Sequence, residues 1–234
     1  MTDTVNLPSE RIIRQLNAWC GLHGLMYTDG KFTWTHAPLS LVPNAFPRAS
    51  FEYVRDIQVI WNKLVDRLSR DREFILKELR EVSDADEFTQ RLMRLYETIP
   101  EDVLREGIQF GIFRSDYMLN HDMRPLQVEL NTIAASAGFL SSKATRFHKY
   151  LMKRNVDDPE MASLVNRVMG SLNKSTKDVL DAIEDNQSLE NLAAALGAAH
   201  RAYGKEKESV VLFIVQQNER NVSEDIACWH ISKL

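Results

Sequence analysis

The sequence predicts an α/β fold in which a helix-rich N-terminal part packs on a mixed sheet. Apolar residues recur every three or four positions over residues 9–23 and again over 50–79, a spacing typical of amphipathic helices. Three shorter apolar runs, at 109–119, 126–133 and 210–215, have the length and residue types of strands. We therefore expect helices and strands to share one core.

The composition excludes several classes of protein. Lys and Arg total 29 against 33 Asp and Glu, a net charge of −4 that argues against a dedicated nucleic-acid binder. A membrane helix needs about 20 apolar residues, and no apolar run in this sequence is that long. The first residues do not resemble a signal peptide. Two cysteines at opposite ends, Cys20 and Cys228, form no disulfide framework and favour a reducing compartment.

The first half of the chain reads mainly as helices. The helix at 9–23 ends at Gly21 and Gly24, and turns with extended chain follow to residue 47. Ser50 is the predicted N-cap of one long amphipathic stretch. A further helix is predicted at 84–96, and Pro100 suits the first turn of a short one.

The second half predicts helices through Tyr150, at 160–173 and at 189–203. The run at 210–215 is apolar on both faces, as in a parallel strand covered by helices. Too few residues follow it for a crossover and a return strand, so we expect a truncated chain. The predicted domains are 1–205, a helical and α/β part, and 206–234, the start of an incomplete α/β domain.

The clearest chemical signal is the predicted strand Gln127-Val-Glu-Leu-Asn131. Strict alternation places Gln127, Glu129 and Asn131 on one face and Val128 and Leu130 on the other. A carboxylate and an amide about 7 Å apart along a strand (two steps of about 3.3 Å) offer hard oxygen ligands of the kind that Mg²⁺ takes. The alternative is a half-exposed strand that shows its polar side to water.

A run of small residues, 134–138, follows this strand and precedes a helix. Ligands of α/β proteins bind beyond the carboxyl ends of strands, and small side chains let a ligand approach backbone N–H groups. Packing alone also explains many such turns.

Arg114 ends the preceding apolar run and could bind a substrate carboxylate in a bidentate manner. A local pair with Asp116 is the alternative. Glu219-Arg220-Asn221 occupies a similar position after the run at 210–215, where a polar loop or helix cap is the alternative. No glycine-rich phosphate-binding motif occurs, so if the protein handles ATP, the loop that closes over it lies elsewhere.

Five collinear segments, which span residues 35 to 225, together resemble eukaryotic glutathione synthetase, an ATP-grasp ligase family. In chain order they are Ala37-Pro-Leu-Ser-Leu-Val-Pro-Asn-Ala-Phe-Pro47, Asp86-Glu-Phe-Thr-Gln-Arg-Leu92, Arg114-Ser-Asp-Tyr-Met-Leu119, Gln127-Val-Glu-Leu-Asn-Thr-Ile133 and Asn218-Glu-Arg-Asn-Val222.

The resemblance implies the N-terminal half of a partial ATP-grasp fold, in which 1–205 belongs to the ATP-binding region and 206–234 begins the substrate-binding domain. It also implies a cytoplasmic homodimer. The implied reaction is that of an ADP-forming carbon–nitrogen ligase, which joins γ-glutamylcysteine to glycine through an acyl phosphate. ATP is the implied co-substrate, and magnesium the implied cofactor. The complete protein would be the ligase, and the isolated chain would be inactive.

The resemblance also implies roles for individual residues. Glu129 and Asn131 match magnesium ligands, Glu129 also lies beside ATP, and Arg114 matches a catalytic, substrate-binding arginine. The γ-glutamylcysteine-binding positions come from two stretches of chain. They are Ile133, Ala134, Ala135 and Ser136 in the first, and Glu219, Arg220, Asn221 and Asp225 in the second.

Three departures from the family pattern stand out. Ala134 replaces a serine, which removes a hydroxyl hydrogen bond, and Asp225 replaces a glutamine, which adds a charge that would repel an anionic substrate. The tail at 226–234 does not resemble the family's continuation. The glycine-rich lid and the ATP-binding lysines that the family carries in its second half have no counterpart in this sequence. These departures support an alternative function, a truncated non-catalytic paralogue that binds γ-glutamyl peptides or a full-length subunit.

Overall fold

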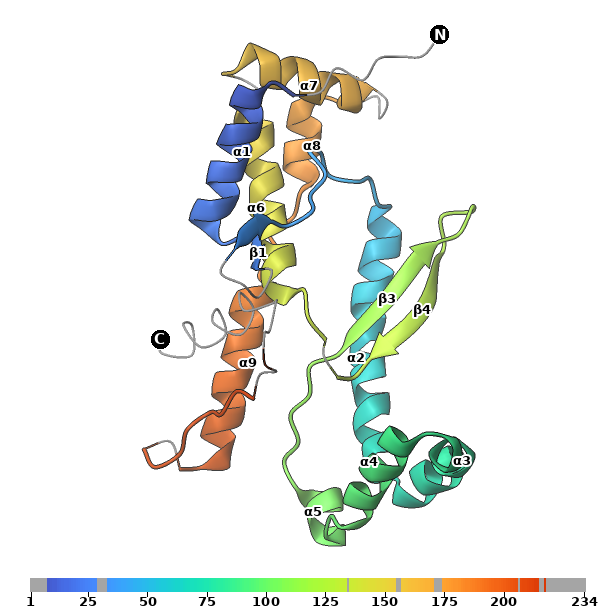
Figure 1. The fold of residues 1–234 in the computed structure, drawn as a ribbon. Coiled ribbons are helices and arrows are strands. Elements are labelled where there is room, and N and C mark those ends of the chain that lie inside the picture. Colours follow the sequence, from blue (N-terminus) through green and yellow to red (C-terminus); the bar gives the residue numbers. More distant parts are fainter. Residues whose placement is uncertain are drawn as a thin grey trace. The chain divides into compact units, whose positions relative to one another are not determined.

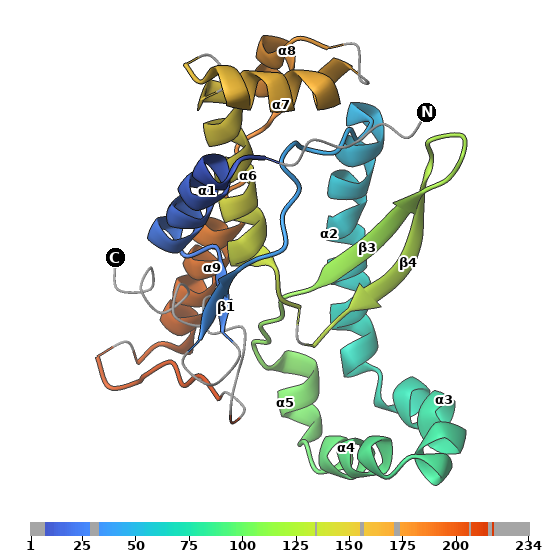
Figure 2. The same cartoon turned by 45° about the horizontal axis from the view of Figure 1, so that its top comes forward.

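A computed structural model describes residues 8–28, 33–133, 135–154, 157–170, 174–205, 207–214 and 217. The chain divides into two compact units (Figures 1 and 2). One unit is Phe46–Ala135, and the other combines Met1–Ala45 with Ser136–Leu234. Each unit has helices and one antiparallel pair of strands among its described residues.

The unit formed by the two flanking segments is mostly helical. Figure 1 shows α1 and α6 packed beside each other. Two short strands pair in antiparallel fashion, with Met26 opposite His36. The elements are α1 (Glu10–His23), β1 (Met26–Thr28), β2 (Trp34–His36), α6 (Gly138–Arg154), α7 (Pro159–Gly170), α8 (Thr176–Ala182) and α9 (Ser188–Tyr203).

The core of this unit lies between α1, α6 and α7. The Trp19 ring lies 5.2 Å from the Phe147 ring and stacks on Tyr150 at 5.6 Å. Burial of such aromatic and aliphatic side chains supplies most of the stabilisation. The main buried apolar residues are Ile12, Leu16, Trp19, Cys20, Leu25, Phe147, Leu151, Met152, Met161 and Val165.

Helix α1 has the ends that its sequence predicts. The Ser9 hydroxyl accepts a hydrogen bond from the Ile12 N–H, and Gly24 ends the helix in the left-handed conformation with φ 74°. Both nitrogens at the tip of the Arg11 guanidinium donate to Asp158, at 2.7 and 3.0 Å, and one of them also donates to Glu160 at 2.9 Å. The start of α1 is therefore tied to the start of α7.

The unit Phe46–Ala135 consists of four helices and one β-hairpin. Among its described residues only Leu104 is a buried hydrophobic, so this unit has little core of its own. Arg70 links helices by donating to three backbone carbonyls around the end of α5. The elements are α2 (Arg48–Arg70), α3 (Arg72–Ala85), α4 (Glu87–Glu97), α5 (Glu101–Glu106), β3 (Arg114–Leu119) and β4 (Pro125–Asn131).

The long stretch predicted from Ser50 to residue 79 is two helices, so that prediction is wrong in two respects. Asp71 leaves helical geometry at φ −91°, ψ 81°, and its side chain accepts from the Phe74 N–H to cap α3. Periodicity continues across this break because both helices pack an apolar face. The N-cap of α2 is Pro47, and the Ser50 hydroxyl instead donates to the Met123 carbonyl at 2.8 Å.

The hairpin β3–β4 packs one face on α2, where the Trp61 indole donates to the Tyr117 hydroxyl at 3.1 Å. Its register is interrupted, because Asp116 pairs with Glu129 but Tyr117 pairs with Gln127. Val128 is therefore an extra residue, a β-bulge. Gln127 thus shares the face of Tyr117, and the prediction that Gln127 lies beside Glu129 is wrong.

Two strand predictions extend too far. The run at 109–119 is strand only from Arg114, because β4 ends at Asn131, the partner of Arg114. Residues 210–214 form no strand, and Val210 and Ile214 are 85% and 90% exposed. The described part of the chain provides no neighbouring strand that could cover this run, and Val215 lies outside it.

The helix-rich α/β class is confirmed, with strands in two antiparallel pairs. Helix α8 was not expected from periodicity, although Ser175 and Asp178 form a capping box before it. Within the described ranges, no helix is both long and apolar enough to cross a membrane.

Candidate active site on the β3–β4 hairpin

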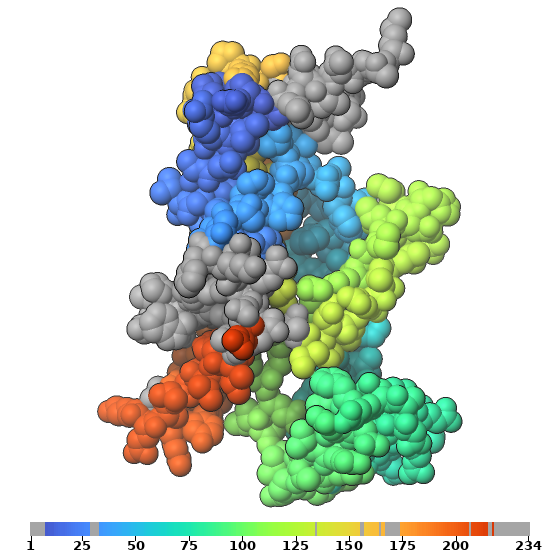
Figure 3. All heavy atoms as spheres, viewed as in Figure 1, coloured from blue at the N-terminus to red at the C-terminus, as the bar shows by residue number. Residues whose placement is uncertain are grey.

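Four polar side chains share the hairpin face that is turned away from α2. Arg114 pairs with Asn131 and Asp116 with Glu129, on the open side of the bulge. Directly paired residues, and residues two apart on one strand, project from the same face. We call this the outer face of the hairpin; Figure 3 shows the hairpin, in yellow-green, at the surface. The predicted Arg114, Glu129 and Asn131 therefore meet.

The four side chains are connected by hydrogen bonds. Nε and Nη2 of Arg114 donate to the two carboxylate oxygens of Asp116 at 2.8 and 3.1 Å. Nδ2 of Asn131 donates to Glu129 Oε1 at 3.0 Å and to Asp116 Oδ2 at 3.4 Å. The same nitrogen reaches the Arg114 carbonyl at 3.3 Å. The local Arg114–Asp116 pair, the alternative to a substrate contact, is thus present.

Electrostatics keep Asp116 ionised. The hydrogen bond from the Arg114 guanidinium lowers the pKa of this carboxyl below its usual value, and contact with Asn131 acts in the same direction. Arg114 and Asp116 are both half-buried, whereas Glu129 is exposed. The outer face therefore combines one guanidinium with two carboxyl side chains, one of them open to solvent.

The donor set suits magnesium. Carboxylate and amide oxygens are hard ligands, and Mg²⁺ commonly takes only one or two of them from protein, with water and phosphate for the rest. Glu129 and Asn131 provide that number on one face. Within the described residues, no group of three or more His, Cys, Asp or Glu side chains is arranged to hold a metal ion.

Of the other predicted binding residues, Ile133, Ala135 and Ser136 lie within the described ranges. Ile133 lies beyond the end of β4 and is 80% exposed. Ala135 is half-buried, and Ser136 is exposed just before α6. Five predicted binding residues lie outside the described ranges: Ala134, Glu219, Arg220, Asn221 and Asp225.

Asp116 is the functional candidate that sequence reasoning undervalued. The sequence suggested it only as a partner that would occupy Arg114, although a residue two positions away on a strand must share the same face. That periodicity, applied to β3 as it was to β4, places Arg114 and Asp116 together.

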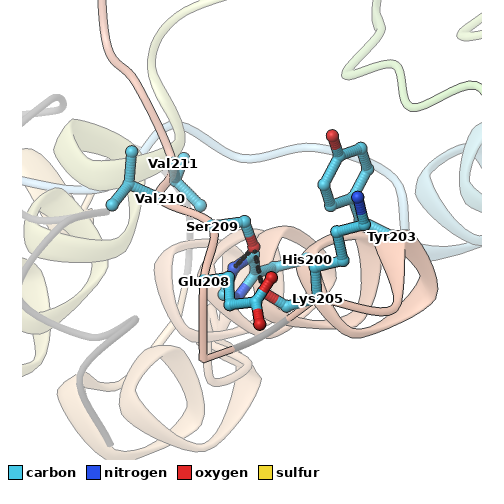
Figure 4. A pocket seen from close by; sticks show the side chains of 7 residues that line it. All are labelled: His200, Tyr203, Lys205, Glu208, Ser209, Val210 and Val211. Carbon is cyan, nitrogen blue, oxygen red and sulfur yellow. Dashed lines mark hydrogen bonds between the residues drawn. The ribbon is translucent and has the colours of Figure 1, made fainter.

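A separate pocket of about 580 Å³ lies at the end of α9 (Figure 4). His200 Nε2 lies 2.8 Å from the Ser209 hydroxyl oxygen, and that hydroxyl donates to the Lys205 carbonyl at 2.7 Å. The hydroxyl proton therefore points at the carbonyl, and His200 is not arranged as a base for Ser209. The lining residues are His200, Tyr203, Lys205, Glu208, Ser209, Val210 and Val211, none of which is a predicted site residue.

Sequence comparisons relate the chain to glutathione synthetases. The family model described as eukaryotic glutathione synthase, ATP binding domain, matches residues 8–226. A glutathione synthetase of Dictyostelium discoideum is 35% identical over 193 residues, which cover 80% of this chain and 37% of the relative. The chloroplastic glutathione synthetase of Solanum lycopersicum is 32% identical over 223 residues, or 91% of this chain and 38% of the relative.

A third relative, the glutathione synthetase large chain of Schizosaccharomyces pombe, is 28% identical over 220 residues, which cover 86% of this chain and 43% of that protein. The chain thus spans less than half the length of these curated relatives.

A solved structure has the same fold. A glutathione synthetase-like effector from Globodera pallida, in its apo form, superposes with a TM-score of 0.66 and 24% identity. The match covers 96% of this chain and 47% of the effector. The family match over residues 8–226 shows that the chain belongs to the eukaryotic glutathione synthase family, within its ATP-binding domain.

Proposed function

We propose that the chain supplies the magnesium- and substrate-binding face of a glutathione synthetase. That enzyme would act in glutathione biosynthesis, joining γ-glutamylcysteine to glycine while ATP becomes ADP and phosphate. The observation that supports this proposal is the meeting of Arg114, Glu129 and Asn131 on the outer hairpin face.

Glu129 and Asn131 would hold magnesium through a carboxylate and an amide oxygen, and Glu129 would lie beside the ATP phosphates. Bound there, magnesium would neutralise charge on the phosphate oxygens during phosphoryl transfer. The hairpin contributes fixed positions, because cross-strand pairing holds both side chains on one face.

Arg114 would bind the substrate carboxylate and hold it in line with the phosphate. A carboxylate is a poor electrophile, so phosphorylation to an acyl phosphate precedes attack by the glycine amine, which expels phosphate. A guanidinium suits both a carboxylate and a phosphate, because its planar N–H groups can donate to two oxygens at once. In this role Arg114 is a catalytic residue.

The remaining assignments belong to the same proposal. The segment 133–136 and residues Glu219, Arg220, Asn221 and Asp225 would contact γ-glutamylcysteine. We also propose that the two domains meet at 205/206, that the protein is cytoplasmic, and that it assembles as a homodimer. The Solanum relative is chloroplastic by name, so location is a point on which family members differ.

Calorimetry on the 234-residue chain tests the proposal. We expect γ-glutamylcysteine to bind, and Arg114→Ala to weaken that binding by at least tenfold, about 1.4 kcal/mol. Glu129→Gln should instead weaken Mg²⁺-dependent ATP binding. Arg124→Ala, which alters an arginine at the hairpin turn, is the matched control. Equal binding by all these variants would contradict the proposed site.

A second candidate function is a non-catalytic module that binds a partner subunit. Two observations favour it: a relative that is named as a large chain, and an exposed apolar stripe on α4. Phe88, Leu92 and Leu95 are 67%, 48% and 64% exposed at helical spacing, the pattern of a helix that docks in a groove.

Two measurements separate these functions. A catalytic assignment predicts glutathione formation from γ-glutamylcysteine, glycine and ATP once the chain is joined to the remaining length of a family member. The module predicts subunit association that Leu92→Ser weakens, measured by sedimentation, with no turnover even in the joined protein.

A further inference from the structure

Asp116 lies at the centre of the outer hairpin face, between two residues that have proposed roles. Its carboxylate accepts from Nε and Nη2 of Arg114 at 2.8 and 3.1 Å. On its other side, Nδ2 of Asn131 lies 3.4 Å from Oδ2 of Asp116. One side chain therefore contacts both the substrate-binding and the metal-binding candidate.

The contact between Asp116 and Arg114 is bidentate, so it fixes the orientation of the guanidinium as well as its distance from the carboxylate. Arginine has many rotamers, and two parallel N–H···O bonds define both the position and the plane of the guanidinium. Asp116 thus holds this group in place before a ligand arrives.

The contacts around Asn131 determine which way its amide points. Nδ2 is surrounded by the Glu129 carboxylate, the Asp116 carboxylate and the Arg114 carbonyl. All three groups accept hydrogen bonds, so the amide nitrogen faces them. The amide oxygen of Asn131, the atom that a hard cation prefers, is the other branch of this amide and is not the atom that faces these three acceptors.

We propose that Asp116 is a positioning residue that holds the Arg114 guanidinium for the substrate carboxylate and turns the Asn131 amide oxygen toward the cation. The inference rests on the proposed function, from which Arg114 and Asn131 take their roles. Asp116 acts through these two neighbours.

The first test uses the ligand-free chain. Nitrogen-15 NMR follows the Arg114 Nε–H and the Asn131 side-chain amide in Asp116→Asn, which removes the charge and keeps the shape. Both signals should shift and exchange faster. The matched control is Asp122→Asn, because Asp122 pairs with Arg124 at the same two-residue spacing in the turn. Unchanged signals in Asp116→Asn would overturn the inference.

The second test measures binding of γ-glutamylcysteine and of Mg²⁺-ATP by calorimetry. Loss of a group that orients metal ligands commonly costs tenfold or more, so Asp116→Asn should weaken both ligands by about tenfold at an unchanged melting temperature. Asp116→Glu, which keeps the charge, should restore most of this loss, and Asp116→Ser serves as the neutral variant if Asp116→Asn does not fold. A loss that Asp116→Glu leaves unrestored would overturn the inference.

The outcomes distinguish this inference from the function beneath it. Wild-type binding together with unaltered binding by Asp116→Asn would overturn the inference alone. A wild-type chain that binds neither ligand would overturn the proposed function and the inference with it.

Discussion

At the scale of single residues, Asp158 shows how one charge pair joins distant parts of the sequence. The hydrogen bonds from the Arg11 guanidinium hold the pKa of this carboxyl well below its usual range, with support from the backbone N–H groups of Met161 and Glu160. The ionised form is therefore favoured in the folded chain, and folding stability is linked to pH.

We expect Asp158→Asn to destabilise the chain most near neutral pH. Because the folded pKa is depressed, the stabilisation is fully present above the ordinary Asp pKa of about 3.9 and is lost as pH falls below it. Urea unfolding from pH 7 to pH 2 should show the difference between wild type and variant shrinking with acidity. The exposed Asp181→Asn is the control, and a difference that grows in acid would contradict this account.

Ala137 provides a second prediction at this scale, because it has φ 83° immediately before α6. This left-handed conformation costs a residue with a Cβ about 1–2 kcal/mol, more than the entropy that glycine loses on folding. Ala137→Gly should therefore raise the free energy of unfolding by about 0.5–1 kcal/mol. Ala194→Gly, within α9, should lower it by about 1 kcal/mol.

Single residues were the most predictable part of the candidate site. Arg114, Glu129 and Asn131 were identified from residue type and strand position, and the structure brings them together. The position of Gln127 was wrong, because alternation assumes one residue per pairing step and Val128 breaks that rule.

At the scale of elements, the hairpin is attached to α2 by the Trp61–Tyr117 hydrogen bond at 3.1 Å. Tyr117→Phe removes the acceptor of a half-buried indole N–H, so we expect a loss of about 1 kcal/mol in urea unfolding. Trp61→Phe with Tyr117→Phe should cost less than the sum of the single changes, because both remove the same bond. Tyr53→Phe, which is 56% exposed, should have no measurable effect.

Helices were predictable where a long apolar pattern ended at capping residues, whereas a cap alone was not enough to identify a helix. Ser9 and Gly24 set the bounds of α1, and Gly204 ends α9 with φ 79°. The seven-residue α8 is too short for periodicity to identify. The Asp71 break between α2 and α3 does not interrupt the apolar pattern, so only the geometry of the cap reveals it.

At the scale of the whole molecule, the buried side chains are distributed unevenly. Leu151 and Met152 are fully buried in the unit built from the flanking segments, whereas the unit Phe46–Ala135 has Leu104 as its buried hydrophobic among the described residues. Stability should follow this distribution, since local opening depends on buried apolar contacts.

Leu151→Ala should lower the free energy of unfolding by about 2–5 kcal/mol, through lost burial and the cavity that remains. Leu95→Ala, at a side chain 64% exposed, should change it by no more than about 0.5 kcal/mol. Hydrogen exchange should show slower exchange in α6 than in α4. Equal protection of the two helices would contradict the uneven core.

The fold class could be read from sequence because it depends on periodicity, but the fate of residues 210–214 could not. An apolar run becomes a buried strand only beside a partner, and the described part of the chain supplies none.

The extra residue Val128 divides the hairpin into two halves, each with its own strand register. The half that carries Glu129 and Asn131 takes its orientation from the pairing of Asp116, and the half toward the turn takes its orientation from Tyr117. Lengthening or shortening the turn at 120–124 would change the strand pairing only in the half of the hairpin next to the turn. The ligand-facing half is thus insulated from changes in loop length, which leaves the turn open to variation among related chains.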